Sequence, residues 1–134
     1  MIMDNNWKYK IELSNDRVFD ELSERYHVRF PDDLRSFIVD NNAAYPEKKL
    51  INIDHNERVF ESVLSFNEKE DDAASVFSII DHTFIKTAIP FGLDPFGNVF
   101  YYSLVSSKIL FWEHEEDRFD HSEYTLQEFI DNLH

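Results

Sequence analysis

The sequence Ile89-Pro90-Phe91-Gly92-Leu93-Asp94-Pro95-Phe96-Gly97-Asn98-Val99-Phe100-Tyr101-Tyr102 is the most informative part of this chain. It contains both glycines of the 134-residue protein and two of its four prolines. Apolar residues before Gly92 predict a buried strand that ends at this glycine, and the β-branched and aromatic residues from Val99 predict a second strand. Two glycines so close together in a glycine-poor chain indicate that the backbone between these strands has a demanding geometry.

A tight turn is predicted between the two strands. In Asp94-Pro95-Phe96-Gly97, proline fixes φ at the second turn position, and the aspartate can accept hydrogen bonds from the backbone that follows. Gly97 adopts positive φ without steric cost, and Asn98 tolerates a left-handed conformation better than most residues. The residue chemistry therefore predicts a type I or type II turn between two core strands.

A hairpin is predicted after this turn, with strands over 99–105 and 108–113 joined through Ser106-Ser107. One face is expected to carry Phe100, Tyr102, Leu110 and Trp112, and the other Val99, Tyr101, Ile109 and Phe111. Because apolar residues occur on both faces, we expect a central strand pair that is covered on both sides.

Two helices are predicted in the first third of the chain. The first begins near Asp16 and places Val18, Phe19, Leu22 and Tyr26 on one face. The second begins at Pro31, whose missing N–H would have no partner in a first helical turn. Two aspartates follow this proline, where the helix dipole favours negative charge, and the helix is expected to end around 40–42.

The remaining segments are predicted to complete a single α+β domain over residues 1–134. A capping box, formed by Thr125 and Glu128, predicts the start of a C-terminal helix. The other expected elements are a short strand or extended lead-in at 4–15, strands at 50–53 and 59–66, a short helix at 73–83, and solvated loops at 68–72 and 113–123.

Composition excludes several classes of protein. The absence of cysteine rules out a disulfide scaffold, a thiolate zinc site, an iron–sulfur cluster and a cysteine nucleophile. Neither a signal-peptide pattern nor a continuous apolar stretch of ~20 residues is present, so we expect a cytoplasmic protein that does not contact membrane. The formal net charge of −14 argues against nucleic-acid binding. The same charge suits a basic protein partner, or it serves solubility alone.

Catalytic and metal-binding motifs are not evident. The segments His114-Glu115-Glu116-Asp117 and Asp120-His121 combine histidines with carboxylates, but their spacing matches no metal motif. A chain with two glycines has no phosphate-binding loop or dinucleotide fingerprint, and its serines lie outside any nucleophile elbow. We therefore predict no catalytic residue, no metal and no cofactor, with a hydrolase that uses a carboxylate pair as the open alternative.

Two acidic loops are the candidate partner-binding residues. A carboxylate surface can dock on lysines and arginines of a partner, and Trp112, Tyr101 and Tyr102 could be aromatic anchors beside it. The alternatives are ordinary solvated loops and aromatic residues of the core. The candidate contact residues are Glu68, Glu70, Asp71 and Asp72 in the first loop, and Glu113, Glu115, Glu116 and Asp117 in the second.

Two segments resemble the SMI1/KNR4 (SUKH) family. Residues 26–42 (YHVRFPDDLRSFIVDNN) are similar to its N-terminal signature, in which a helix, an apolar–Pro pair and an acidic residue precede a second helix. The central stretch resembles the family's strand–turn–strand motif. The motif residues are Pro31, Gly92, Asp94, Gly97 and Asn98. The resemblance covers about residues 16–134. Asn42-Ala43-Ala44 departs from it, because glycine is usual there, and Asn42 is expected to form the left-handed helix cap instead.

The resemblance implies a central, mostly antiparallel sheet surrounded by helices. Most bacterial members look like immunity proteins, which bind a cognate toxin domain, often a nuclease or a nucleic-acid deaminase, and block it stoichiometrically. Fungal members are similar in fold but act as intracellular regulators and scaffolds, so a non-catalytic regulatory module is the alternative. We expect a monomer or weak homodimer whose partner is a toxin domain with a basic surface.

Overall fold

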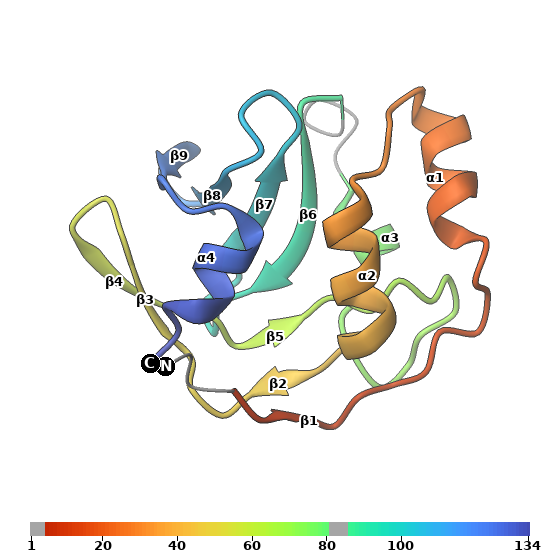
Figure 1. Ribbon diagram of the computed structural model, residues 1–134, viewed down its shortest axis with the longest axis horizontal. Coiled ribbons are helices and arrows are strands. Elements are labelled where there is room, and N and C mark those ends of the chain that lie inside the picture. Colours follow the sequence, from red (N-terminus) through yellow and green to blue (C-terminus); the bar gives the residue numbers. More distant parts are fainter. Residues whose placement is uncertain (1–4, 81–85) are drawn as a thin grey trace.

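The computed structural model describes residues 5–80 and 86–134, which form an α+β fold (Figure 1). This part of the chain contains four helices, a five-stranded antiparallel sheet and two two-stranded sheets. None of the described helices is long and apolar enough to span a bilayer. In chain order the elements are β1 (Trp7–Lys8), α1 (Val18–Tyr26), α2 (Asp32–Asn41), β2 (Tyr45–Pro46), β3 (Leu50–Ile53), β4 (Asn56–Val59), β5 (Ser62–Val63), α3 (Val76–Ile79), β6 (Ala88–Leu93), β7 (Val99–Ser103), β8 (Ile109–Glu113), β9 (Arg118–His121) and α4 (Leu126–Asp131).

The main sheet has the strand order β5-β6-β7-β8-β9, and every neighbouring pair is antiparallel. β7 occupies the middle of the sheet, with β6 and β8 on its two sides. The predicted antiparallel sheet and the interior position of the strands around the central turn are therefore confirmed.

The register of β7 and β8 corrects the predicted faces of this hairpin. Phe100 lies opposite Phe111, and Tyr102 lies opposite Ile109, so an even-numbered residue pairs with an odd-numbered one. Residues directly opposite in an antiparallel pair point to the same face. The face toward the large core therefore carries Phe100, Tyr102, Ile109 and Phe111, and the other face carries Val99, Tyr101, Leu110 and Trp112.

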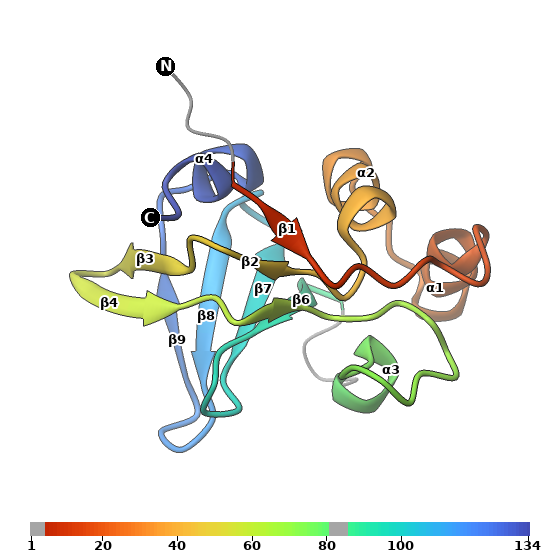
Figure 2. The same cartoon turned by 90° about the horizontal axis from the view of Figure 1, so that it is seen from below.

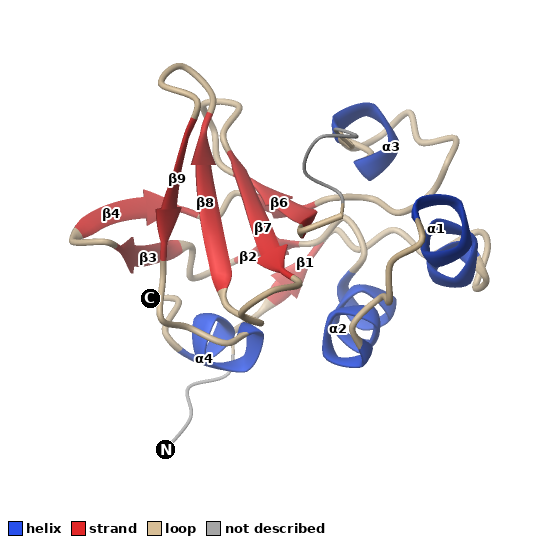
Figure 3. Cartoon of the chain, turned by 90° about the horizontal axis from the view of Figure 1, so that it is seen from above, coloured by secondary structure: helices blue, strands red, loops and turns tan. Residues whose placement is uncertain are grey.

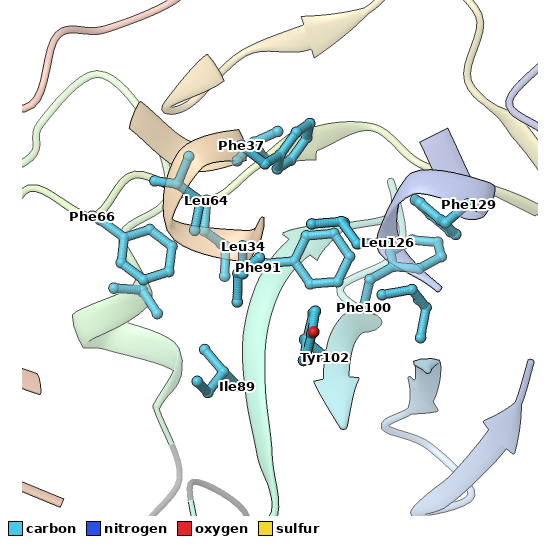
Figure 4. Close-up of a cluster of buried hydrophobic side chains, with 14 of the residues drawn as sticks. Leu34, Phe37, Leu64, Phe66, Ile89, Phe91, Phe100, Tyr102, Leu126 and Phe129 are labelled. Atoms are coloured by element: carbon cyan, nitrogen blue, oxygen red, sulfur yellow. The ribbon is translucent and has the colours of Figure 1, made fainter. Parts of the chain in front are cut away.

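A large apolar core lies between one sheet face and helices α2 and α4. Figure 4 shows Phe91 of β6 and Phe100 of β7 beneath the two helices, with Phe37 on α2 and Phe129 on α4. The ring of Phe91 is 6.5 Å from Phe37 and 6.0 Å from Phe129, measured between centroids. The opposite sheet face has a smaller cluster of Ala88, Val99, Tyr101 and Leu110. The prediction that the strand pair now seen as β7 and β8 is covered on both sides is confirmed.

Gly92 lies inside β6 and does not end that strand, which corrects the prediction. A β-bulge lies between Pro90 and Gly92. A Cβ added to Gly92 would lie 2.2 Å from Cε2 of Phe60, a side chain that is completely buried. Glycine is therefore needed here because an aromatic ring packs directly on the backbone.

The connection after α2 also differs from the prediction. Asn42 is extended, with φ −54° and ψ 129°, and Ala43 takes the left-handed conformation with φ 60°. The Asn42 side chain is 2% exposed, donates to the carbonyl of Ile11 at 3.0 Å, and accepts from the backbone N–H of Phe66 at 2.7 Å. Asn42 is thus the C-cap residue of α2 and is hydrogen-bonded to two other segments, but the left-handed conformation is taken by Ala43.

Several predicted elements differ from the observed ones in length or in continuity. The alternating N-terminal segment forms only the two-residue β1, and the predicted strand 59–66 is divided between β4 and β5. The predicted helix 73–83 is observed over Val76–Ile79, and its residues 81–83 lie outside the described residues. The predicted loop 113–123 contains strand β9, because this segment pairs with the edge of β8.

Candidate functional site

Two turns lie side by side at one end of the main sheet (Figures 2 and 3). One connects β6 to β7 and contains the predicted Asp-Pro-Phe-Gly turn, while the other connects β8 to β9 and contains the second acidic loop. We call residues 94–98 and 113–118 the sheet tip. The fold therefore brings the central motif and one of the two candidate binding loops together.

The β6–β7 turn is held by a buried carboxylate. Asp94, which is 7% exposed, accepts hydrogen bonds at Oδ1 from the backbone N–H groups of Phe96 at 2.8 Å and Asn98 at 2.7 Å. Its Oδ2 accepts from Nδ2 of Asn98 at 2.8 Å. Gly97 has φ +86°, as the turn chemistry predicted. Local hydrogen bonds and one glycine thus determine the conformation of this turn.

The second turn is fastened to the first by hydrogen bonds from His114. Its backbone N–H donates to Oδ1 of Asn98 at 3.0 Å, and its Nε2 lies 3.0 Å from the carbonyl oxygen of Phe96. Within the second turn, Nε1 of Trp112 donates to Oδ1 of Asp117 at 3.0 Å. The two turns consequently form one connected unit.

The carboxylates of the second turn differ in how strongly they are engaged. Glu113 and Glu116 form ion pairs with Arg118, and Arg58 lies 3.0 Å from buried Asp120 in the same network. The hydrogen bond that Arg118 donates to Asp120, together with the negative charges of nearby carboxylates, raises the pKa of Arg118. Glu115 is exposed and has no hydrogen bond or ion pair with any residue that the structure describes. The most available negative charge at the tip is therefore that of Glu115.

Phe96 is the tip residue that the sequence analysis did not single out. Its side chain is 75% exposed, and no ring contact joins it to another described aromatic residue. It occupies the third position of the Asp-Pro-Phe-Gly turn, and turns of this kind usually lie at the protein surface. This turn position could have predicted that Phe96 is exposed. The abundance of phenylalanine in the chain instead favoured a place for it in the core.

The first acidic loop lies elsewhere. Figures 1 and 2 place residues 67–74 beside α1 and α3, away from the sheet tip. Glu70 is turned inward and accepts from Oγ of Ser65 at 2.8 Å and from Nδ2 of Asn67 at 3.1 Å. Burial alone would raise the pKa of Glu70, but these hydrogen bonds and those from the following backbone lower it overall. Glu70 therefore stabilises the conformation of this loop through hydrogen bonds.

The other three carboxylates of this loop, Glu68, Asp71 and Asp72, are exposed. They remain available to a partner.

The predicted aromatic anchors are mainly core residues. Tyr101 and Tyr102 are buried, and Trp112 is partly buried. The hydroxyl of Tyr102 donates to the carboxylate of Asp33 at 3.0 Å, and burial followed by this hydrogen bond raises the pKa of Tyr102. This pair borders a groove of 640 Å³ whose walls include Pro31. The groove is lined by charges of both signs, from Arg29 and Lys86 and from Asp32 and Asp33, so it does not favour a ligand of one charge sign.

The family model described as SMI1-KNR4 cell-wall (SUKH_6) matches residues 18–130. The match begins at the first residue of α1, ends within α4 and includes the whole sheet tip. The chain belongs to the SMI1/KNR4 (SUKH) family. No curated protein is similar enough to the chain to count as a match. The family resemblance seen in the two sequence segments is confirmed.

SUKH proteins are a family of immunity proteins and are generally non-catalytic. In this SUKH domain, the motif residues have distinct structural tasks. Gly92 admits the Phe60 ring, Asp94 and Asn98 hold the tip by hydrogen bonds, and Gly97 supplies positive φ. Within residues 5–80 and 86–134, no three His, Asp or Glu side chains gather as the ligands of a metal ion would.

Replacing Asp94 by alanine is expected to lower the free energy of unfolding of this SUKH domain by about 1–3 kcal/mol, because donors at the turn lose their acceptor. Urea unfolding measures the difference. Asp94→Asn is the matched control, since its remaining carbonyl oxygen can still accept from the two backbone N–H groups, and it should lose less stability. Equal losses in the two variants would contradict the role of Oδ1.

Proposed function

We propose that this SUKH domain is a cytoplasmic immunity protein, which neutralises a cognate toxin domain by stoichiometric binding and catalyses no reaction. The observation that carries the proposal is the sheet tip, where an acidic turn and the family's central turn form one connected unit. Family membership supports the same function.

Charge supports a basic toxin surface as the target. The chain has a formal net charge of −14, and Glu115, Glu116 and Asp117 are exposed at the tip. Enzymes that act on nucleic acids have basic surfaces, because they hold phosphates. Opposite fields accelerate the encounter of two proteins and orient them. A nuclease or nucleic-acid deaminase domain is therefore the favoured class of toxin.

The contacts are assigned to both acidic loops, with the larger share at the tip. Glu115, Glu116 and Asp117 belong to the turn that His114 joins to the backbone of exposed Phe96. Glu68, Asp71 and Asp72 form a second, separate contact surface. Glu70 and Glu113 are expected to contribute through the conformation of their loops, because each carboxylate is engaged within the domain.

The function is tested by co-expressing this chain with a toxin domain that a neighbouring gene encodes. The expected results are restored growth of the host cells and a stable one-to-one complex of the purified proteins. Growth arrest despite full expression of the soluble chain would exclude the immunity function for that toxin. Recovery of only a signalling or structural protein from the native cells would favour a regulatory module instead.

Charge reversal tests the assigned surface. The triple variant Glu115→Lys/Glu116→Lys/Asp117→Lys is expected to weaken toxin binding at least ~10-fold and to flatten its dependence on salt concentration, because favourable charge pairs become repulsive. Isothermal titration calorimetry at low and high salt measures both effects.

A matched triple variant in the other loop, Glu68→Lys/Asp71→Lys/Asp72→Lys, makes the same change in net charge. It should weaken binding less than the tip variant. Equal effects of the two variants would indicate attraction by overall charge, and unchanged affinity in both would remove both loops from the interface.

A further inference from the structure

Phe96 differs from the other exposed apolar residues of the described chain. These residues are Tyr9, Val39, Tyr45, Phe96 and Val105. Tyr9 and Tyr45 pack against each other, with ring centroids 6.0 Å apart. Phe96 has the only phenylalanine side chain in this exposed set, and three-quarters of its surface faces solvent. A single exposed apolar residue is ordinary, so its surroundings must decide whether it has a role.

The backbone that carries Phe96 is fixed on both sides. Its N–H donates to Asp94, and its carbonyl oxygen lies at hydrogen-bond distance from the ring of His114. The next two residues are constrained by positive φ at Gly97 and by four hydrogen bonds that Asn98 forms with Asp94 and His114. A side chain presented on such a rigid turn loses little freedom when it binds.

The surroundings of Phe96 are acidic. The neighbouring turn places Glu115, Glu116 and Asp117 on the same connected unit, through the contacts of His114. The cationic partner of this turn, Arg118, is already engaged by Glu113, Glu116 and Asp120. An exposed apolar side chain on one turn, with exposed carboxylates on the turn that is hydrogen-bonded to it, matches a pocket with an apolar floor and a rim of lysine or arginine.

We infer that Phe96 is the anchor residue of the interface, and that it inserts into an apolar pocket on the toxin domain that is bordered by basic side chains. The inference rests on the proposed immunity function and adds the residue and the pocket that give the interface its specificity. Interface energy is usually concentrated in a few such anchors, which are often aromatic and surrounded by residues that exclude water. The acidic residues then guide the encounter, and Phe96 prolongs the lifetime of the complex.

The test measures binding of the purified neighbouring-gene toxin domain to the full chain and to four variants. Phe96→Ala is expected to weaken binding by ~30-fold or more, mainly through faster dissociation. Phe96→Leu should retain most of the affinity, because it keeps an apolar side chain. Val105→Ala is the control, since Val105 is equally exposed but lies in the β7–β8 turn. It should bind as the unchanged chain does.

Asp94→Asn separates anchoring from turn conformation. It keeps the Phe96 ring but removes one bond that holds the turn, so binding should weaken less than in Phe96→Ala. Thermal unfolding of each variant verifies that it folds, and Phe96→Ala should unfold at the same temperature as the unchanged chain, because its ring has no core contacts.

The outcomes distinguish the two proposals. Equal toxin affinity of Phe96→Ala and the unchanged chain would overturn the anchor while leaving the immunity function intact. Equal weakening by Phe96→Ala and Val105→Ala would also overturn it, since the effect would then not be specific to the tip. Failure of the unchanged chain to bind the toxin domain would overturn the immunity function, and the anchor with it.

Discussion

Truncation of Phe60 to alanine will lower the free energy of unfolding by about 3–5 kcal/mol, the range for a phenylalanine removed from a packed core. Phe60 is fully buried, and its ring contacts Phe91, Phe100 and Phe129 at centroid distances of 5.8, 5.0 and 5.5 Å. It also covers the backbone at Gly92. The truncation therefore removes contacts to both core strands and to α4, and it leaves a cavity between them.

Urea unfolding, followed by far-ultraviolet circular dichroism, measures this loss. Phe96→Ala is a matched control, because it makes the same chemical change at an exposed position, and it should change the free energy by no more than about 0.5 kcal/mol. A loss below about 1 kcal/mol for Phe60→Ala would show that the core does not depend on this ring.

Substitution of Gly92 by alanine is expected to cost about 3 kcal/mol, near the upper end for overpacking a core. The added Cβ would lie 2.2 Å from Cε2 and 2.5 Å from Cζ of Phe60, well inside contact distance. The ring cannot move to solvent, because it is completely buried among other rings. Either the ring or strand β6 must therefore be displaced.

The double variant Phe60→Leu/Gly92→Ala tests this cause. Leucine occupies less space than phenylalanine, so the two substitutions should cost less together than the sum of their separate effects. Urea unfolding of both single variants and the double variant gives the coupling energy. Strict additivity would mean that the cost of alanine at position 92 arises from the backbone and not from the Phe60 ring.

Features that depend on local chemistry were predictable from the sequence. The capping box of Thr125 and Glu128 is observed, and α2 begins within one residue of the predicted start, with Pro31 as its extended N-cap and Asp32 as its first residue. The turn at Asp94 is also observed, with the expected bonds from the carboxylate to the following backbone. In each case the residues that determine the conformation lie within four positions of one another, so no knowledge of the fold was needed.

Features that depend on distant contacts were not predictable in this way. Gly92 was interpreted as a strand end, although the residue that demands glycine, Phe60, is 32 positions away in the chain. Ala43 takes the left-handed conformation because Asn42 is held by Ile11 and Phe66. Hydrophobic periodicity cannot show such pairings, since it reports only which side of an element is apolar.

The candidate site was predictable only in part. The acidic residues of both loops were evident from the sequence, but their separation in space was not, because it depends on how the strands are ordered. The joining of the two turns requires the bonds between His114, Phe96 and Asn98, which cross 16 to 18 positions of the chain. The exposure of Phe96 likewise follows from the position of the whole turn, not from its residue type.

The construction of the tip has a consequence for how such a protein can evolve. The residues that hold the turns, including Asp94, Gly97 and Asn98, act through buried side chains or the backbone, whereas the side chains of Phe96 and Glu115 are exposed and form no hydrogen bond, ion pair or ring contact with another described residue. The residues that stabilise the tip and the residues that form its exposed surface are therefore different. Mutations at the exposed positions can therefore change the surface of the tip with little loss of stability, while the scaffold stays the same.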